Sequence, residues 1–157
     1  MNEGKSTAAE AVSIFEDYLA ETHRRRTPER FVILEAAMSL RRRFTAEDLQ
    51  RKLLDNGQRL SLPTVYSTLQ MLTECSLLSR IAIDGRAALY QKASRSRNHT
   101  LCILCGKVTD IKNPQLEEIV DHLSLPGFRK SHSSLTVYGV CTSCIRKERK
   151  SNRKSKK

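Results

Sequence analysis

Between residues 10 and 75, apolar side chains recur every three or four positions, in four blocks that polar turns separate. This period predicts amphipathic helices over 10–24, 27–40, 45–56 and 61–75. Thr or Ser stands at the start of each of the last three blocks, and such a hydroxyl caps the N-terminus of a helix. The hydrophobic pattern therefore predicts four helices in the first half of the chain.

A different pattern follows the fourth block. Residues 77–83 and 87–91 are strand-like and flank Asp84-Gly85, a dipeptide that favours a tight hairpin turn. Helices followed by a short hairpin predict a winged helix-turn-helix over residues 10–92. The polar stretch 93–98, which lacks large apolar side chains, predicts a linker after it.

The second half of the chain predicts a small α/β unit over residues 99–146, so the expected fold class is α+β. Strand-like runs at 99–101, 108–111 and 135–140 surround a helical pattern at 114–125. A unit of about 50 residues seldom folds on a hydrophobic core alone. We therefore expect a bound metal, or pairing with a second copy, to stabilise this unit.

Two Cys-x-x-Cys pairs flank the second unit: Cys102 with Cys105, and Cys141 with Cys144, separated by 35 residues. Four thiolates suit the tetrahedral coordination of zinc, and a two-residue spacer lets one turn present two sulfurs to one ion. The pattern predicts one structural zinc per chain, with disulfides or independent thiols as the alternative. Cys75, at the end of the fourth predicted helix, is expected to be a small buried hydrophobic side chain.

The net charge is strongly positive, because 28 Lys and Arg stand against 17 Asp and Glu, which gives +11. Residues 146–157 alone contribute +7. An excess of this size predicts an anionic partner, most often nucleic acid. We expect residues 147–157 to form a disordered basic tail that adds affinity for nucleic acid without sequence specificity.

Several classes of protein are disfavoured by missing patterns. The sequence has no apolar run long enough for a membrane span or a signal peptide, which predicts a cytoplasmic protein without a membrane partner. It also lacks the His-x-Glu of zinc deaminases, a Gly-rich phosphate loop, a nucleophile elbow and His-Glu-x-x-His. We therefore expect a binding protein and not an enzyme.

Five short motifs follow one another along residues 20–145: Thr27-x-x-Arg30, Thr45-Ala46-Glu47-Asp48-Leu49, Pro63-Thr64-Val65-Tyr66, Cys102-x-x-Cys105-Gly106-Lys107-Val108 and Tyr138-Gly139-x-Cys141-x-x-Cys144. Their combination resembles the ferric uptake regulator (Fur) superfamily of bacterial metal-responsive transcription regulators. The resemblance implies a homodimer that pairs through its C-terminal dimerisation domains and binds an inverted-repeat operator in double-stranded DNA. It also implies a regulator, and more specifically a repressor, of metal-homeostasis or oxidative-stress genes.

Candidate DNA contacts gather at the start of the fourth predicted helix, whose N-terminal end would enter the major groove. By resemblance, the ring of Tyr66 contacts thymine methyl groups; an aromatic side chain at the edge of the core is the alternative interpretation. Ser67 stands where many relatives have Arg. Arginines before the second helix and at the hairpin tip are candidate phosphate contacts, or solvated surface. The full set of candidates is Arg25, Arg26, Arg30, Pro63, Thr64, Tyr66, Ser67 and Arg86.

The resemblance breaks at the regulatory metal site. Relatives bind Fe, Mn or Zn with a His before the third helix, a Glu on the wing and a His-rich segment before the first cysteine pair. In these places this chain has Arg43, Gln91 and, of the last segment, only His99. Arg cannot ligate a cation, so we expect this site to be lost, with Arg43 and Arg97 pairing with carboxylates to hold the DNA-competent form.

Three alternatives stay open. A degenerate regulatory metal site could form from His99, Glu117 and His132. The same fold could instead respond to haem or to a redox signal, with Cys75 and His132 as its candidate residues. A different class of protein, a zinc-ribbon module for RNA binding or protein assembly, would bind polyanions without selecting an operator.

Overall fold

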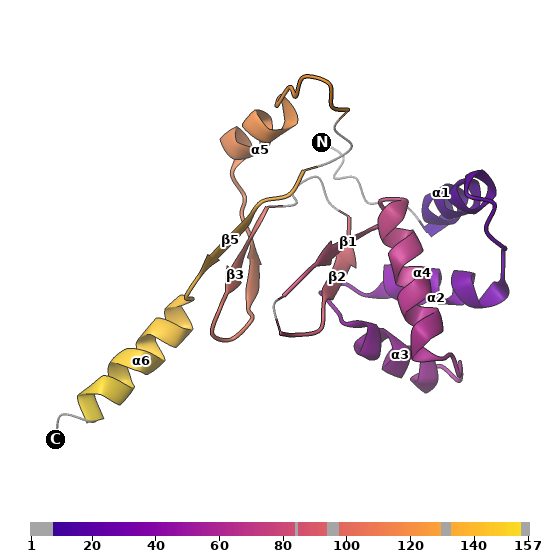
Figure 1. Cartoon of the computed structure of the whole chain (residues 1–157). Helices are drawn as coiled ribbons and strands as arrows, with labels where there is room; N and C mark the ends of the chain where they lie inside the picture. The colour runs from indigo at the N-terminus through magenta and orange to yellow at the C-terminus, as the bar shows by residue number, and fades with distance from the viewer. Residues whose placement is uncertain (1–7, 84, 94–97, 130–132, 155–157) are drawn as a thin grey trace. The chain divides into compact units, whose positions relative to one another are not determined.

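Figure 1 shows the chain as a computed structural model, which describes residues 8–83, 85–93, 98–129 and 133–154. The chain divides into two compact units, residues 1–94 (unit 1) and residues 95–157 (unit 2). Both units mix helices with strands, so the α+β class expected from the sequence is confirmed. No helix in the described part of the chain is long and apolar enough to cross a membrane.

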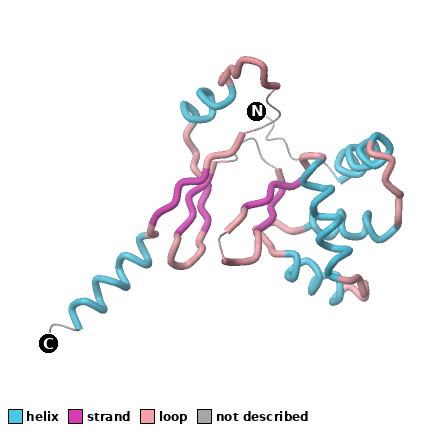
Figure 2. Tube along the Cα trace, viewed as in Figure 1, coloured by secondary structure: helices cyan, strands magenta, loops and turns pink. Residues whose placement is uncertain are grey.

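Within its described residues, unit 1 consists of four helices followed by a two-stranded sheet (Figure 2). The helices are α1 (Ala8–Glu21), α2 (Pro28–Ser39), α3 (Ala46–Asp55) and α4 (Leu62–Glu74), and the strands are β1 (Leu78–Ile81) and β2 (Leu89–Lys92). The two strands pair antiparallel, with Leu78 opposite Lys92 and Ile81 opposite Leu89. These elements lie where the hydrophobic period predicts them.

The helices α3 and α4 both begin at capped positions. Thr45 and Asp48 form a capping box: the Asp48 amide donates to Thr45 Oγ1 over 3.1 Å, and the Thr45 amide donates to Asp48 Oδ2 over 2.9 Å. At the start of α4, Ser61 Oγ accepts from the Thr64 amide over 3.3 Å. The caps fix where each helix starts, and the first turns of α4 carry the candidate DNA contacts.

One face of α4 lies at the centre of the hydrophobic core. Val65, Thr68, Leu69 and Leu72 are fully buried, and the Thr68 hydroxyl donates to the Thr64 carbonyl over 2.9 Å. The other three helices contribute side chains to the same core that are at most 2% exposed: Phe15, Leu19, Ile33, Leu34, Leu49 and Leu53. Because this face of α4 is committed to the core, the opposite face stays at the surface.

The segment before α3 joins the small sheet. Phe44 and Tyr90 exchange two backbone hydrogen bonds, of 3.0 and 2.8 Å. Their rings stack with centroids 6.1 Å apart. The hairpin of β1 and β2 is therefore fixed to the start of α3 through both backbone and side-chain contacts.

In unit 2 the described residues form a three-stranded sheet and two helices (Figure 1). The elements are β3 (His99–Cys102), β4 (Val108–Asp110), α5 (Pro114–Asp121), β5 (Thr136–Gly139) and α6 (Thr142–Lys154). The strand order is β4-β3-β5, with β4 antiparallel and β5 parallel to β3. Cys102 at the end of β3 lies opposite Gly139 at the end of β5, so the parallel pairing brings the two cysteine pairs to the same end of the sheet.

The structure departs from two sequence expectations in unit 2. Residues 147–157 are expected to be disordered, but α6 continues to Lys154, and residues 155–157 lie outside the described residues. Lys, Arg and Glu are good helix formers, and the helix starts beside Cys141, whose carbonyl accepts from the Ile145 amide over 3.0 Å. Asn98, the last residue of the predicted linker, is 4% exposed and accepts from the Leu135 amide over 3.1 Å, so it belongs to unit 2.

Unit 2 has little hydrophobic interior of its own. Among its described residues, only Leu101 and Cys102 are buried apolar side chains. Its surface carries large apolar side chains from the turn after β3, from α5 and the residues after it, and from β5 and the residues beside it: Ile103, Leu104, Ile119, Leu123, Leu125, Phe128, Leu135, Val137, Tyr138 and Val140. Hydrophobic burial within one copy therefore contributes little to the stability of this unit.

Candidate functional site

The four cysteines predicted to bind metal come together from two segments of unit 2, residues 102–105 and 141–144. Cys102 is the last residue of β3, and Cys105 lies in the turn that follows it. Cys141 follows β5, and Cys144 lies in the first turn of α6. The pairing of β3 with β5 therefore brings together two cysteine pairs that lie far apart in the sequence.

The distances between the sulfurs fit a tetrahedral metal site. All four Sγ atoms lie within 4.8 Å of one another. Cys102 Sγ is 3.9 Å from Cys144 Sγ, and Cys105 Sγ is 3.7 Å from Cys141 Sγ. Zinc–sulfur bonds of about 2.3 Å in a tetrahedron place the sulfurs about 3.8 Å apart. The four side chains can therefore hold one metal ion.

Backbone amides point at this cluster and stabilise negative charge on it. The Cys141 amide donates to Cys102 Sγ over 3.3 Å. This hydrogen bond, together with one from the Cys105 amide, lowers the pKa of the Cys102 thiol to about 6. The hydrogen bond between the thiols of Cys144 and Cys141 raises the pKa of Cys144 to about 12. The cluster therefore favours a thiolate at Cys102, the form in which sulfur ligates a metal.

The residues proposed for a degenerate regulatory site do not form a second cluster among the described residues, where the four cysteines are the only group of three or more potential ligands. His99 is 6% exposed, and its Nε2 lies 2.9 Å from Thr136 Oγ1. Glu117 is half-buried on α5. His132 lies outside the described residues, as does Arg97.

At the positions of two expected regulatory ligands, the structure has a hydrogen bond between side chains. Arg43, just before α3, donates from Nε to Gln91 Oε1 on β2 over 2.7 Å. Both side chains are half-buried. The contact lies beside the backbone pairing of Phe44 with Tyr90, so it adds a side-chain link between the start of α3 and the hairpin.

The candidate DNA contacts on α4 lie in its first two turns, on or beside the surface face. Pro63, Tyr66 and Ser67 are exposed, and Thr64 is half-buried. Ser67 Oγ donates to the Thr64 carbonyl over 3.0 Å. Tyr66 is 39% exposed. These side chains present hydroxyl groups and one aromatic ring at the N-terminal end of the helix.

The hydroxyl of Tyr66 has a partner that the sequence did not predict. It donates to Glu47 Oε1, on α3, over 2.8 Å. This hydrogen bond lowers the pKa of Glu47 and raises the pKa of Tyr66. At neutral pH the pair therefore consists of a carboxylate acceptor and a neutral phenol donor.

The arginines proposed as phosphate contacts lie at the surface of unit 1. Arg25 and Arg26 are exposed before α2, and Arg30 is half-buried in its first turn. Arg26 forms an ion pair with Glu16, and Arg30 donates to the Arg25 carbonyl. Exposed ion pairs of this kind contribute little to stability, so Arg26 can exchange its partner for a phosphate at low cost. Arg86 is exposed between β1 and β2.

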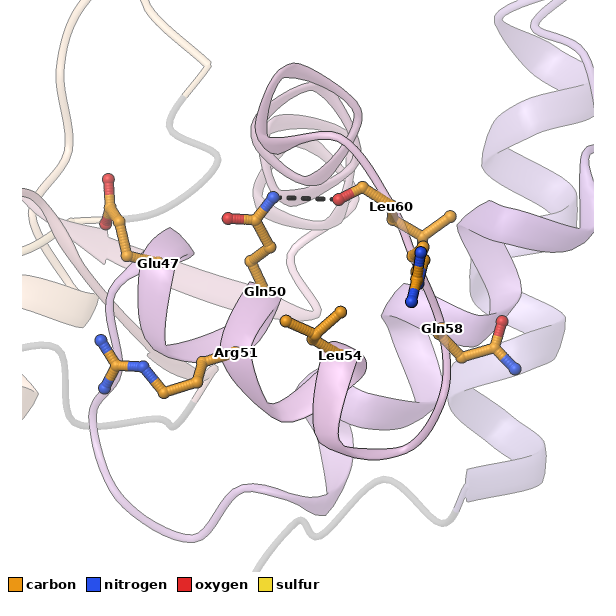
Figure 3. Close-up of a pocket in the computed structure, with 7 residues that line it drawn as sticks. Glu47, Gln50, Arg51, Leu54, Gln58 and Leu60 are labelled. Carbon is orange, nitrogen blue, oxygen red and sulfur yellow. Dashed lines mark hydrogen bonds between the residues drawn. The ribbon is translucent and has the colours of Figure 1, made fainter.

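A surface groove lies between one face of α3 and the turn that leads into α4 (Figure 3). Gln50 Nε2 donates to the Leu60 carbonyl over 2.9 Å, which ties the turn to the helix. The spacing i, i+3, i+4 and i+7 puts four of the lining residues on one face of α3. The lining residues are Glu47, Gln50, Arg51, Leu54, Gln58, Arg59 and Leu60.

Residues 21–138 of the chain match the sequence profile of the ferric uptake regulator family. A peroxide operon regulator from Bacillus subtilis (strain 168) is 32% identical over 131 residues, which cover 83% of this chain and 90% of that protein. This relative is thus a regulator and not an enzyme.

Solved structures give the same result. The structure of the ferric uptake regulator from Pseudomonas aeruginosa with manganese is 26% identical, with a TM-score of 0.65 over 81% of this chain and 97% of that chain. The Helicobacter pylori ferric uptake regulator, whose structure has three functional metal-binding sites, has a TM-score of 0.70 over 92% of this chain and 97% of that chain. At 15% identity, the second likeness supports the fold alone.

We expect one tightly bound metal ion per chain, and we expect Cys105→Ser to lose it. The Cys105 side chain is exposed, so the substitution removes a ligand without leaving a cavity in a core. Metal analysis after gel filtration measures the metal per chain. Cys75→Ser is the matched control, because Cys75 lies in unit 1 and outside the cluster. Equal metal content in Cys105→Ser and the unsubstituted protein would contradict the site.

Proposed function

From the premise that the chain belongs to the ferric uptake regulator family, we propose that it is a DNA-binding transcription regulator, and more specifically a repressor of metal-homeostasis or oxidative-stress genes. The observation that carries this proposal is the exposed N-terminal face of α4. This face presents Pro63, Thr64, Tyr66 and Ser67 from a helix whose other side is locked into the core. We propose that it acts on chromosomal DNA in the cytoplasm.

In this proposal unit 1 is a winged helix-turn-helix. The N-terminal end of α4 enters the major groove, as recognition helices do, and the hairpin of β1 and β2 is the wing. Tyr66 reads base edges, while Arg25, Arg26, Arg30 and Arg86 contact phosphates and fix the register on the duplex. The net charge of +11 supports an anionic partner of this kind.

We propose that unit 2 pairs with a second copy to form a homodimer that binds an inverted repeat. The support is the surface of unit 2, where ten large apolar side chains are exposed and only two apolar side chains are buried among the described residues. Large exposed apolar patches mark interaction sites. Pairing two copies of one surface gives two-fold symmetry, and a two-fold dimer matches a palindromic operator.

The metal proposed for the four-cysteine cluster is zinc. Four thiolates at tetrahedral spacing suit zinc, and a site closed by four protein ligands leaves no position for a substrate or water. Its role is therefore structural: it joins the end of β3, the turn after it and the start of α6. For such sites, metal-binding free energy is folding free energy.

We further propose that the regulatory metal site of relatives is lost in this chain. The support is that Arg43 and Gln91 stand at two of the expected ligand positions and form a hydrogen bond with each other. One of these side chains is a cation and the other is a neutral amide. A fixed positive charge disfavours a second cation nearby. The hydrogen bond links the hairpin to the start of α3 without metal, so unit 1 is competent for DNA in its absence.

Two alternative functions have less support. A redox signal through Cys75 requires a reactive thiolate, but burial raises the pKa of this thiol. An RNA-binding or assembly module would bind polyanions without sequence preference. The organised polar face of α4 favours the operator-binding function over such a module.

The proposal predicts that the protein selects an inverted repeat from a random duplex library and protects both half-sites in a footprint. Tyr66→Ala is expected to weaken operator binding by about 5- to 150-fold, the range of one good base contact. Gln70→Ala, an exposed substitution further along the same helix, is the control and should leave affinity unchanged. Salt-sensitive binding with no selected sequence would contradict the proposal.

Arg43→Ala is expected to weaken operator binding by about 2- to 12-fold, because it removes one hydrogen bond that holds the hairpin. Arg42→Ala removes the same charge at an exposed neighbouring position and serves as the control. Operator titration by fluorescence anisotropy measures both variants. Equal losses in the two variants would show that charge, and not the hydrogen bond to Gln91, causes the effect.

A further inference from the structure

We propose that Glu47 is a positioning residue that fixes the direction of the Tyr66 side chain, and so contributes to base discrimination without contacting a base. The inference rests on the proposed function, because it assigns a role to the surface of α4 that is proposed to read DNA. It concerns a residue of α3 that lies 19 positions before Tyr66 in the sequence.

The Tyr66 hydroxyl lies 2.8 Å from Glu47 Oε1, so the far end of the ring is held as well as its attachment to α4. Glu47 is itself held: it is in the first turn of α3, next to the capping box of Thr45 and Asp48. Below this polar contact, α3 and α4 share the hydrophobic core. The ring therefore connects two helices whose separation is fixed.

Tyr66 is 39% exposed, and an exposed tyrosine without a partner can rotate between rotamers on the nanosecond scale. Glu47 is half-buried, and its second oxygen, Oε2, is shielded from solvent with no hydrogen-bond partner in the described part of the chain. The half-buried carboxylate of Glu47 therefore holds the more exposed ring of Tyr66 in one orientation.

The hydrogen bond from Tyr66 lowers the pKa of Glu47, so the carboxylate is ionised at neutral pH and can only accept. The phenol must then donate its single proton to Glu47. Its oxygen is left as an acceptor, which suits an amino group of adenine or cytosine and disfavours the acceptor atoms of guanine. The contact therefore sets which bases the hydroxyl tolerates, as well as where the ring points.

The carboxylate also has an electrostatic effect. Glu47 lines the groove beside the turn into α4, together with Arg51 (Figure 3). A negative charge at this surface repels phosphates regardless of sequence, which weakens non-specific binding. Removing the charge should therefore lower the preference for operator over unrelated DNA in two ways. The Tyr66 ring would be less fixed at the operator, and unrelated DNA would bind more tightly.

The test is a double-mutant cycle with Glu47→Ala and Tyr66→Phe, read as the ratio of affinities for the selected operator and for a duplex with one substituted base pair. Each single variant is expected to lower this ratio by about 2- to 12-fold, the range of the net contribution of one hydrogen bond. The double variant is expected to lower it no further, because the two side chains act through one contact.

Two further variants separate positioning from a general effect on the fold. Glu47→Gln keeps an acceptor oxygen at the same position and is expected to restore most of the ratio. Glu35→Ala removes an exposed carboxylate on α2 and should leave the ratio unchanged. In the protein without DNA, the pKa of Tyr66, measured by ultraviolet titration, should fall toward its ordinary value of 10.0 in Glu47→Ala.

The outcomes are distinguishable. Independent losses that add in the double variant, or an unchanged pKa of Tyr66 in Glu47→Ala, overturn the positioning role and leave the operator function intact. A protein that selects no operator overturns the proposed function, and the positioning role with it. Non-additive losses with a lowered pKa of Tyr66 support the role.

Discussion

The shortage of buried apolar surface in unit 2 is the constraint on which the rest of the molecule depends. Among the described residues of this unit, only Leu101 and Cys102 bury apolar side chains, and burying one such side chain contributes about 1.5–3 kcal/mol. A structural zinc site contributes about 10–16 kcal/mol in small peptides. A metal bound by the four thiolates would therefore outweigh the whole interior of this unit, and it would join the end of β3 to the start of α6.

The same shortage explains the surface of unit 2. Apolar side chains that would form a core in a larger domain are exposed here, on α5, on β5 and in the turns, for example Ile119, Phe128 and Val137. A second copy could cover them, as the proposed homodimer requires. Unit 1 has the opposite character, since its four helices enclose a continuous core that fixes α4 from one side. The division suits a regulator in which one unit assembles and the other binds DNA.

Much of this arrangement could be predicted from the sequence because it depends on periodicity and spacing. The period of three to four placed all four helices of unit 1, and Thr45 with Asp48 marked the start of α3, where a capping box forms. The two Cys-x-x-Cys pairs predicted a four-thiolate cluster, and the sulfurs do gather. In each case a short-range pattern in the sequence determines the position of the helix, the cap or the metal ligands.

The contacts that could not be predicted join residues that no local pattern relates. Arg43 and Gln91 are 48 positions apart, and Glu47 and Tyr66 are 19 apart. Each contact depends on how α3 packs against its neighbours, which spacing alone does not determine. The prediction of a disordered C-terminal tail was wrong for the described residues. It rested on the dense positive charge, although Lys, Arg and Glu are good helix formers and α6 continues to Lys154.

We propose a DNA-binding regulator that holds a structural zinc and needs no second metal. The most direct measurement is operator affinity of protein shown to carry one zinc per chain, before and after saturation with Fe(II), Mn(II) or Zn(II) and gel filtration. We expect one zinc per chain throughout and an unchanged affinity for the operator. A second equivalent that binds reversibly and tightens operator binding would contradict it.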